Sequence, residues 1–504
     1  MSNMSHTATS GANRTAILAI ILASYVMIVL DISIVITGLP KIQNELGFSD
    51  AGLSWVPNAY TLTFGGFLLL GARAGDILGR RRMLLAGLTV FTVSSLLIGA
   101  AQSPAWLIAA RATQGVGSAI LAPSTLALLQ IHFPAGPERT RAVSFYASAA
   151  GVSASIGLVI GGLLADWLSW RVGFFINLPV GIVLLLAIRR HVGETQRHSG
   201  AFDMAGALTS TLGMSALVFG IVHSAAAGWL DALTLQSICC GGLLLVVFVL
   251  IEWRARQPIM PLRLFASRER SGAYIARLFF IGANVGFFFF STQFIQGALG
   301  FSASRAGLAF LPATIANFIA ALQAPRLIAR FGGGTVLMGS MALGLVGMVW
   351  LGLTAVNTTY WSGLAVPMIL IGIGQGGALG PLTISGISGV PANDAGAASG
   401  LVNAAHQLGS SLGLGILVAA SVIGSGMLGG AELLTHRLDN AMEAGASLIA
   451  FALLMAFATL RPLSPGLAAR HLEPRSPEIL PGQVSKDILG RKALTQKTSL
   501  PADE

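Results

Sequence analysis

The chain has 504 residues, of which 54% are hydrophobic and only 10% are charged, and its mean hydropathy is +0.76. Soluble globular domains carry about 25% charged residues, so this composition excludes a soluble globular protein. The two cysteines, Cys239 and Cys240, are adjacent within an apolar run, which excludes a disulfide scaffold. The net charge of +10 would suggest a nucleic-acid partner in a soluble chain, but its meaning here depends on where the charges lie.

Long apolar segments follow one another along almost the whole chain. About 20 mostly apolar residues form a helix that crosses a bilayer. Fourteen segments meet this criterion, with approximate bounds 15–38, 53–72, 83–101, 105–130, 142–165, 172–189, 204–224, 233–252, 274–298, 306–325, 335–355, 361–389, 397–424 and 443–461. The first is too long for a signal peptide and is interpreted as an uncleaved span. The expected fold class is therefore an all-α polytopic membrane protein.

The positive charges are distributed unevenly between alternate loops. With both termini placed in the cytoplasm, 24 of the 30 Lys and Arg residues fall in inner loops or terminal segments. Four fall in outer loops, and two, Arg111 and Arg277, lie within spans. Such a bias orients membrane proteins, so it explains the positive charge without a nucleic-acid partner.

An internal repeat divides the chain. The sequence AGLSWVP at 51–57 returns as AGLAFLP at 306–312, and both copies follow a Gly-Phe-Ser. The offset exceeds one six-span unit by enough residues for two further helices, and parallel six-span repeats are a known transporter plan. We therefore expect a cytoplasmic N-terminus at 1–14, a first repeat at 15–190, two inserted spans at 191–256, a second repeat at 257–462, and a disordered cytoplasmic tail at 463–504.

Asp31 is the carboxylate that lies well within a predicted span. A charge in the hydrocarbon costs about 2.5–3.5 kcal/mol on insertion scales, so Asp31 should face a cavity or a partner. If its surroundings change during a cycle, it binds and releases a proton, and the alternative is a permanent ion pair. Arg111 in the fourth span is the expected partner, with a purely structural role as its alternative. Arg277, only a few residues into the ninth span, is expected to snorkel to the inner interface.

The remaining polar groups give little sign of other chemistry. His223 and His406 are intramembrane imidazoles, for which packing is favoured over a proton relay. No spacing of His, Cys and carboxylates indicates a metal site. No GxxxxGK[ST] loop is present, so we expect no direct use of ATP, and we expect no cofactor.

The inner loop between the second and third spans reads GARAGDILGRRRML. Gly75 and Gly79 permit a tight turn, and Asp76 is favourably placed near a helix N-terminus. Arg80 begins a basic triplet that fixes orientation. We interpret these four residues as a latch between the two halves on the cytoplasmic side. A topology anchor is the alternative, and both roles are compatible.

Several motifs occur in a fixed order. They are Leu30-Asp31-Ile-Ser33 through Leu39-Pro40 in span 1, the inner loop above, and Arg111, Gln114, Gly115 and Gly117 in span 4. Gly157, Gly161 and Gly162 follow in span 5, where Leu158 replaces the usual proline, and Trp170-Arg171 opens span 6. In this arrangement the chain resembles the 14-span drug:proton antiporters of the major facilitator superfamily. The resemblance covers nearly the whole chain.

This resemblance implies a major facilitator fold and proton-coupled export across the inner membrane of a bacterial cell by a monomer. Asp31 and Arg111 would couple protons, and Gly157, Gly161 and Gly162 would pack span 5. The second repeat has no acid in spans 9 to 13, and Glu443 lies near the outer end of span 14, so we expect neutral or monovalent cationic lipophilic substrates such as drugs, antibiotics and toxic metabolites. Candidate cavity residues are Tyr25, Trp55, Tyr60, Phe287 and Phe288.

Rival functions follow from the same features. A proton-coupled importer of a small metabolite keeps the fold and reverses the direction, and the imperfect span 5 motif keeps this alternative open. A membrane enzyme would need a cluster of His and acidic residues at one interface, which the sequence lacks. A non-transporting sensor on the same fold is a further alternative.

Overall fold

The computed structural model describes residues 11–133, 137–195, 202–255, 258–354, 358–390, 394–426 and 428–460, and every regular element in these ranges is a helix. Within these ranges thirteen helices are long and apolar enough to cross a membrane, and the apolar part of α6, Val152–Trp167, is a shorter candidate. Each of the fourteen predicted spans corresponds to one of these segments, so the polytopic all-α fold is confirmed. The predicted tail and most of the predicted N-terminal segment lie outside the described residues.

The helices divide into three groups along the chain. The first comprises α1 (Gly11–Leu46), α2 (Asp50–Leu53), α3 (Trp55–Leu78), α4 (Arg80–Gly99), α5 (Pro104–His132), α6 (Pro137–Trp167), α7 (Trp170–Phe175) and α8 (Asn177–His191). The second is the pair α9 (Met204–Ala227) and α10 (Ala232–Arg254). The third comprises η1 (Leu262–Ala266), α11 (Arg268–Gly297), α12 (Ala303–Ala309), α13 (Leu311–Phe331), α14 (Gly333–Leu351), η2 (Tyr360–Ala365), α15 (Val366–Gly386), α16 (Ala395–Ser421) and α17 (Gly430–Thr459).

The repeated Gly-Phe-Ser forms the same local structure twice. Gly47 and Gly300 both adopt positive φ, +72° and +67°, a backbone conformation that favours glycine. Ser49 then caps the short helix α2 by accepting the N–H of Gly52, and Ser302 caps α12 in the same way. The repeat in the sequence therefore encodes a repeated helix entry before α3 and α13.

Several helices extend beyond the apolar segments that predicted them. The helix α17 begins at Gly430, not near residue 443, so Glu443 lies inside it with an exposed side chain. Its first three turns are amphipathic, and a window that counts only apolar residues misses them. Helix α1 likewise continues through Pro40 to Leu46. The predicted spans therefore mark the apolar centres and not the helix ends.

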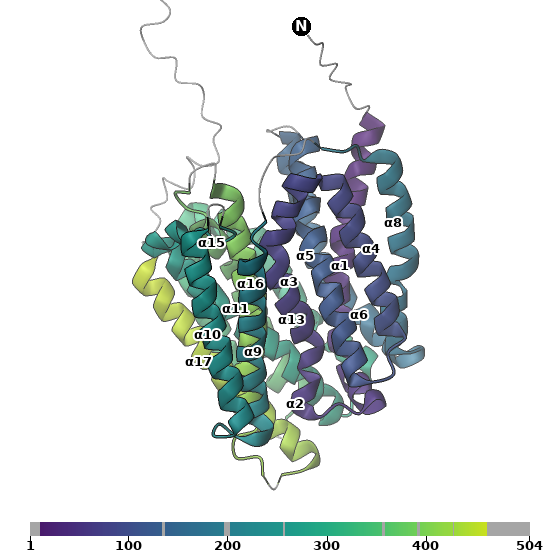
Figure 1. Cartoon of the computed structure of the whole chain (residues 1–504). Helices are drawn as coiled ribbons and strands as arrows, with labels where there is room; N and C mark the ends of the chain where they lie inside the picture. The colour runs from purple at the N-terminus through teal and green to yellow at the C-terminus, as the bar shows by residue number, and fades with distance from the viewer. Residues whose placement is uncertain are drawn as a thin grey trace, which may run out of the picture.

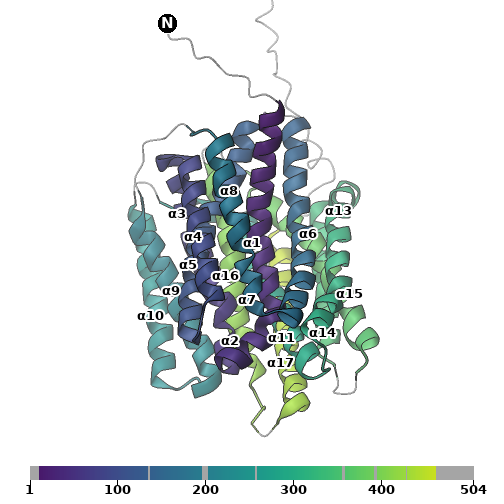
Figure 2. The same cartoon turned by 90° about the vertical axis from the view of Figure 1, so that its right-hand side faces the viewer.

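The helices form an upright bundle (Figures 1 and 2). In Figure 1, α1, α4, α5, α6 and α8 lie to the right, and α11, α15, α16 and α17 lie to the left. The pair α9 and α10 packs on the outside, with α9 in contact with both α3 and α16. We call the upper end in Figure 1, where α1 begins and Arg80 follows α3, the basic end, and the other the opposite end. The division into two repeats and two inserted spans stays a prediction.

The first and third groups of helices are fastened together at the opposite end. Asp166 of α6 accepts the backbone N–H groups of Ala303 and Ser304, at 3.1 and 2.7 Å, where α12 begins. Lys41 of α1 forms an ion pair with Asp166 at 3.0 Å. A Cβ at Gly162 would collide with the carbonyl oxygen of Ala303. These contacts close the seam between the two groups at this end.

Candidate functional site

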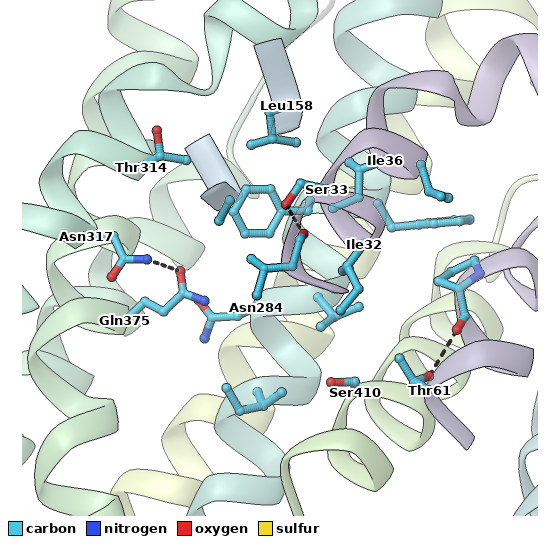
Figure 3. Close-up of a pocket in the computed structure, with 18 of the residues that line it drawn as sticks. Ile32, Ser33, Ile36, Thr61, Leu158, Asn284, Thr314, Asn317, Gln375 and Ser410 are labelled. Atoms are coloured by element: carbon cyan, nitrogen blue, oxygen red, sulfur yellow. Dashed lines mark hydrogen bonds between the residues drawn. The ribbon is translucent and has the colours of Figure 1, made fainter. Parts of the chain in front are cut away.

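A cavity of about 410 Å³ lies between the first and third groups of helices. Residues of α1, α3, α5 and α6 line one side, and residues of α11, α13, α15 and α16 line the other. Most of the wall is apolar: Ile32 and Ile36 of α1 and Leu158 of α6 face into it in Figure 3. Its size and apolar wall are typical of sites that bind small organic molecules.

The polar groups of the wall come mainly from the third group of helices. Asn317 of α13 donates to Gln375 of α15 at 3.2 Å, and Asn284, Thr314 and Ser410 lie around the same space (Figure 3). Such side chains are unfavourable against lipid and belong at an interface or a cavity. Among the described residues that line the cavity there is no Asp or Glu.

Asp31 and Arg111 form a buried ion pair beside the cavity. Nη1 of Arg111 lies 2.7 Å from Oδ2 of Asp31, and the two side chains are 2% and 0% exposed. Nε of Arg111 donates to the carbonyl oxygen of Val56 at 3.1 Å, and its guanidinium lies 4.4 Å from the ring centre of Tyr60. The expected pairing is therefore present, and its role in proton coupling stays a prediction.

Two amides complete the surroundings of Asp31. Gln114 and Asn177 donate to its Oδ1 at 2.8 and 3.0 Å, and both also donate to Ser95. Both carboxylate oxygens are thus occupied. Arg111 lines the cavity whereas Asp31 does not, so the arginine separates the carboxylate from the cavity in this conformation.

The five aromatic candidates divide between the cavity and other packing. Tyr60 and Phe288 line the cavity as expected, but the other three do not. Tyr25 stacks on Tyr146 at 3.9 Å, and Trp55 packs near Phe219 of α9. Phe287 is fully buried beside Phe310. These three rings pack against other side chains and do not line this cavity, so their part in substrate binding stays a prediction.

The expectation that Arg277 snorkels to the interface is wrong. Its residue exposure is 7%, and its Nη1 donates to Thr383 at 2.9 Å. Its Nη2 lies 3.3 Å from Nδ1 of His406, which lines the cavity. The helix α11 begins at Arg268, so Arg277 lies more than two turns inside it and not at its end. His223, in contrast, lies near the end of α9 and contacts Asp231 at 3.3 Å.

The predicted cytoplasmic latch makes its contacts within one half. Arg80 pairs with Asp76, and its backbone N–H donates to Thr195, just after α8, at 3.0 Å. Gly79 has φ +104°, and Gly75 leaves room for the Arg80 side chain. The contacts of these four residues found among the described residues join α3, α4 and the end of α8. The latch interpretation requires contacts between the first and third groups of helices. In this conformation the contacts of these four residues among the described residues do not join those groups.

The glycines of span 5 pack α6 closely against its neighbours. A Cβ at Gly157 would lie 2.6 Å from Cβ of Ser33, and one at Gly161 would lie 2.7 Å from Cα of Ile34, both on α1. Gly162 faces Ala303 of α12 instead. Two of the three therefore hold α6 against α1, and the third lies where the two halves meet.

Sequence reasoning gave the amides of the site no role, although Gln114 is part of the span 4 motif. Gln114 follows Arg111 by three residues and so shares its helix face, which is a signal that the spacing contains. Asn317 and Gln375 are amides inside apolar spans, and their cost in lipid also indicates an inward position. Asn177 reaches Asp31 from a helix 146 residues away, and nothing in the local sequence predicts that contact.

Comparisons with known proteins identify relatives of this chain. The family model of the Major Facilitator Superfamily matches residues 21–414. The chain is 39% identical over 473 residues to the cephamycin export protein CmcT of Amycolatopsis lactamdurans, covering 92% of this chain and 96% of that one. It is 38% identical over 413 residues to the puromycin resistance protein pur8 of Streptomyces alboniger, covering 80% of this chain and 81% of that one.

A third relative and a solved structure agree with these. The tetracenomycin C resistance and export protein of Streptomyces glaucescens is 32% identical over 429 residues, covering 84% of this chain and 79% of that one. The structure of a bacterial homologue of the human lysosomal transporter Spinster, inward-facing and occupied, superposes with a TM-score of 0.62. It is 15% identical and covers 92% of this chain and 98% of that chain, so it supports the fold alone.

These matches confirm a transport protein rather than an enzyme. Its relatives are bacterial export proteins, so it is a multi-pass protein of the inner membrane that exports small molecules. The chain belongs to the Major Facilitator Superfamily, among its drug-efflux members.

Proposed function

We propose that the chain is a proton-coupled exporter that moves lipophilic small molecules through its central cavity and binds the coupling proton at Asp31. The observation that carries this proposal is the Asp31–Arg111 ion pair, which is buried and yet has its arginine in the cavity wall. A substrate or a helix movement that draws Arg111 away leaves a buried carboxylate without its counter-charge. Such a group is neutralised by taking up a proton.

The charge bias of the loops supports an orientation of the protein in the membrane. The basic end is proposed to be cytoplasmic, with both termini on that side. A proton that moves inward then gains about 2.3 kcal/mol per 100 mV from the membrane potential. The contacts of Asp166 with Ala303 and Ser304 close the outer end, and they would break when the cavity opens outward.

The composition of the cavity wall supports one part of the substrate prediction. A lipophilic substrate suits the apolar wall, and relatives named for the export of cephamycin and tetracenomycin C support an antibiotic-like molecule. A monovalent cation, the other predicted class, would meet Arg111 and His406 and no carboxylate among the described lining residues. The wall therefore supports neutral over cationic substrates.

The test is transport of a fluorescent lipophilic compound into inside-out vesicles with an acidified lumen. Wild type should accumulate the compound, and an uncoupler should abolish the accumulation. Asp31→Asn should lose gradient-driven accumulation, whereas Glu432→Gln, an exposed acid at the start of α17, should retain it. Equal accumulation by Asp31→Asn would remove Asp31 from the coupling role, and accumulation in the opposite orientation would indicate an importer.

A further inference from the structure

Arg277 is a buried cation for which the described residues supply no counter-charge. Its residue exposure is 7%, and no carboxylate lies within ion-pair distance of it in the described part of the chain. Its two hydrogen-bond partners, Thr383 and His406, are neutral acceptors, and its Nε is buried with no partner. A buried charge is costly unless it is paired, so this arrangement is incomplete as a purely structural one.

His406 connects this charge to the cavity. A guanidinium can only donate, so the contact at 3.3 Å makes Nδ1 of His406 the acceptor and leaves its proton on Nε2. His406 is partly exposed and lines the cavity, and no described residue accepts the Nε2 hydrogen. The imidazole therefore offers the cavity one N–H donor at Nε2, and the guanidinium of Arg277 contacts the other ring nitrogen, Nδ1.

The position of this pair suits the end of an amphipathic molecule. His406 is the lining residue of α16 nearest the basic end, and Arg277 precedes the lining residue Ile281 by one turn of α11. Further into the cavity apolar side chains such as Ile32 and Phe288 make up most of the wall, with uncharged polar groups such as Asn284 between them. One unpaired charge at one end and a mostly apolar wall beyond it match a molecule with one anionic group and a lipophilic body.

Arg111 does not offer the same site. Its guanidinium is already bound to Asp31, Gln114 and the carbonyl oxygen of Val56. An anion there would compete with a carboxylate held in place by two amides. Among the described residues, the unpaired positive charge beside the cavity is that of Arg277.

We propose that Arg277 and His406 form a carboxylate-binding site at the basic end of the cavity, and that the substrates include lipophilic monocarboxylates. The binding site follows from this geometry alone, and only the statement that such molecules are exported rests on the proposed function. A carboxylate accepts the Nε2 hydrogen of His406 and is held by the charge of Arg277. Charge-assisted hydrogen bonds of this kind discriminate strongly against an uncharged amide of the same shape.

The test compares two probes that differ in one charge. N-dansyl-leucine and N-dansyl-leucine amide share their lipophilic body, and dansyl fluorescence reports their binding to the full chain in lipid nanodiscs. Wild type should bind the acid about tenfold or more tightly than the amide. Arg277→Gln should lose this preference with unchanged binding of the amide, and Arg277→Lys should keep part of it. Arg326→Gln, an exposed arginine of α13 bonded to Gln323, is the control and should behave as wild type.

The remaining outcomes overturn the proposal. They are a wild type that binds the acid no more tightly than the amide, or binds neither probe, and an Arg277→Gln variant that keeps the preference. Because the amide reports on the folded cavity, loss of both probes in Arg277→Gln would also overturn it, by showing that the residue acts on the fold. Binding is measured without a proton gradient, so a failure of proton coupling in vesicles is a separate result.

Discussion

Arg111 and Arg277 are both buried inside spans, but their charges are compensated differently. Arg111 belongs to the first half of the molecule, α1 to α8, and Arg277 to the second half, η1 to α17. Arg111 is paired with Asp31 at 2.7 Å and has an aromatic ring beneath its guanidinium. Arg277 has only neutral partners among the described residues. Arg111 is compensated as long as Asp31 stays ionised, so its pairing is tied to the protonation of that carboxylate, whereas the uncompensated charge of Arg277 is open to an anion from the cavity. The comparison suggests that the first half holds the coupling group and the second half recognises the substrate.

The largest expected effect is on thermal stability, which substitution of Arg111 and of Arg277 should change differently. Removing one partner of a buried ion pair typically costs about 3–5 kcal/mol, because the other charge is left unpaired. Arg111→Gln should therefore lower the midpoint of thermal unfolding strongly, whereas Arg277→Gln removes an unpaired charge and should not lower it. The measurement is thermal unfolding of the purified proteins in the same detergent.

A double variant serves as the control for this prediction. Asp31→Asn combined with Arg111→Gln leaves no unpaired charge, so it should regain much of the stability lost in Arg111→Gln. A similar loss of stability in Arg111→Gln and Arg277→Gln would contradict the proposed difference between the halves.

The second prediction concerns a substitution that adds a carboxylate beside Arg277. Thr383 lies 2.9 Å from Nη1 of Arg277, so Thr383→Asp places a carboxylate beside that guanidinium. The new ion pair should weaken binding of N-dansyl-leucine about tenfold, or about 1.4 kcal/mol, with little effect on the amide probe. Thr383→Asn is the matched control, because it has the same shape without the charge. Equal binding of the acid by the two variants would show that the charge of Arg277 does not contribute to binding of the acid.

Much of the fold and one part of the site could be predicted from the sequence. Apolar length is a local signal that predicts the spans, and the ordered motifs of spans 1, 4, 5 and 6 carry the resemblance to the family. Asp31 and Arg111 were paired because a charge inside a span needs a partner. The apolar segment of the ninth span begins near residue 274 and so predicts Arg277 close to a helix end, whereas α11 begins at Arg268.

The rest depends on contacts between helices that local sequence does not encode. Whether an aromatic residue faces the cavity depends on the rotation of its helix, which placed Phe288 in the wall and Phe287 out of it. Asn177 reaches Asp31 only because α8 packs beside α1. The link between His406 and Arg277 joins α16 to α11 across 129 residues.

The third prediction concerns the neutral polar groups of the second half. Asn317→Leu removes the donor that Gln375 accepts at 3.2 Å, and a lost hydrogen bond of this kind costs about 0.5–1.5 kcal/mol. The variant should unfold at a slightly lower temperature, and Asn317→Leu combined with Gln375→Leu should recover part of the loss. Neither should alter the acid-to-amide preference, since neither removes a charge. A changed preference would move the recognition site from Arg277 toward these amides.

The smallest effect concerns an ion pair of the second half that lies outside the spans. Arg263 donates to both carboxylate oxygens of Asp394, at 2.8 and 2.6 Å, and these hydrogen bonds hold the pKa of Asp394 below its ordinary value. A lowered carboxyl pKa stabilises the fold above the ordinary value of about 3.9, and this contribution is lost as the pH falls through the lowered pKa. The Arg263 side chain is 68% exposed, so solvent and salt screen the pair.

Arg263→Gln should therefore have a slightly lower unfolding midpoint than wild type at neutral pH. The difference should shrink as the solution is acidified through the range in which Asp394 takes up its proton, and it should also shrink in high salt. The measurement is the unfolding midpoint of both proteins against pH at low and high salt. A difference that stays constant with pH would show that Arg263 acts through packing. A difference as large as that of Arg111→Gln would contradict the distinction between a fully buried pair and one whose arginine is exposed, because only full burial makes an unpaired charge so costly.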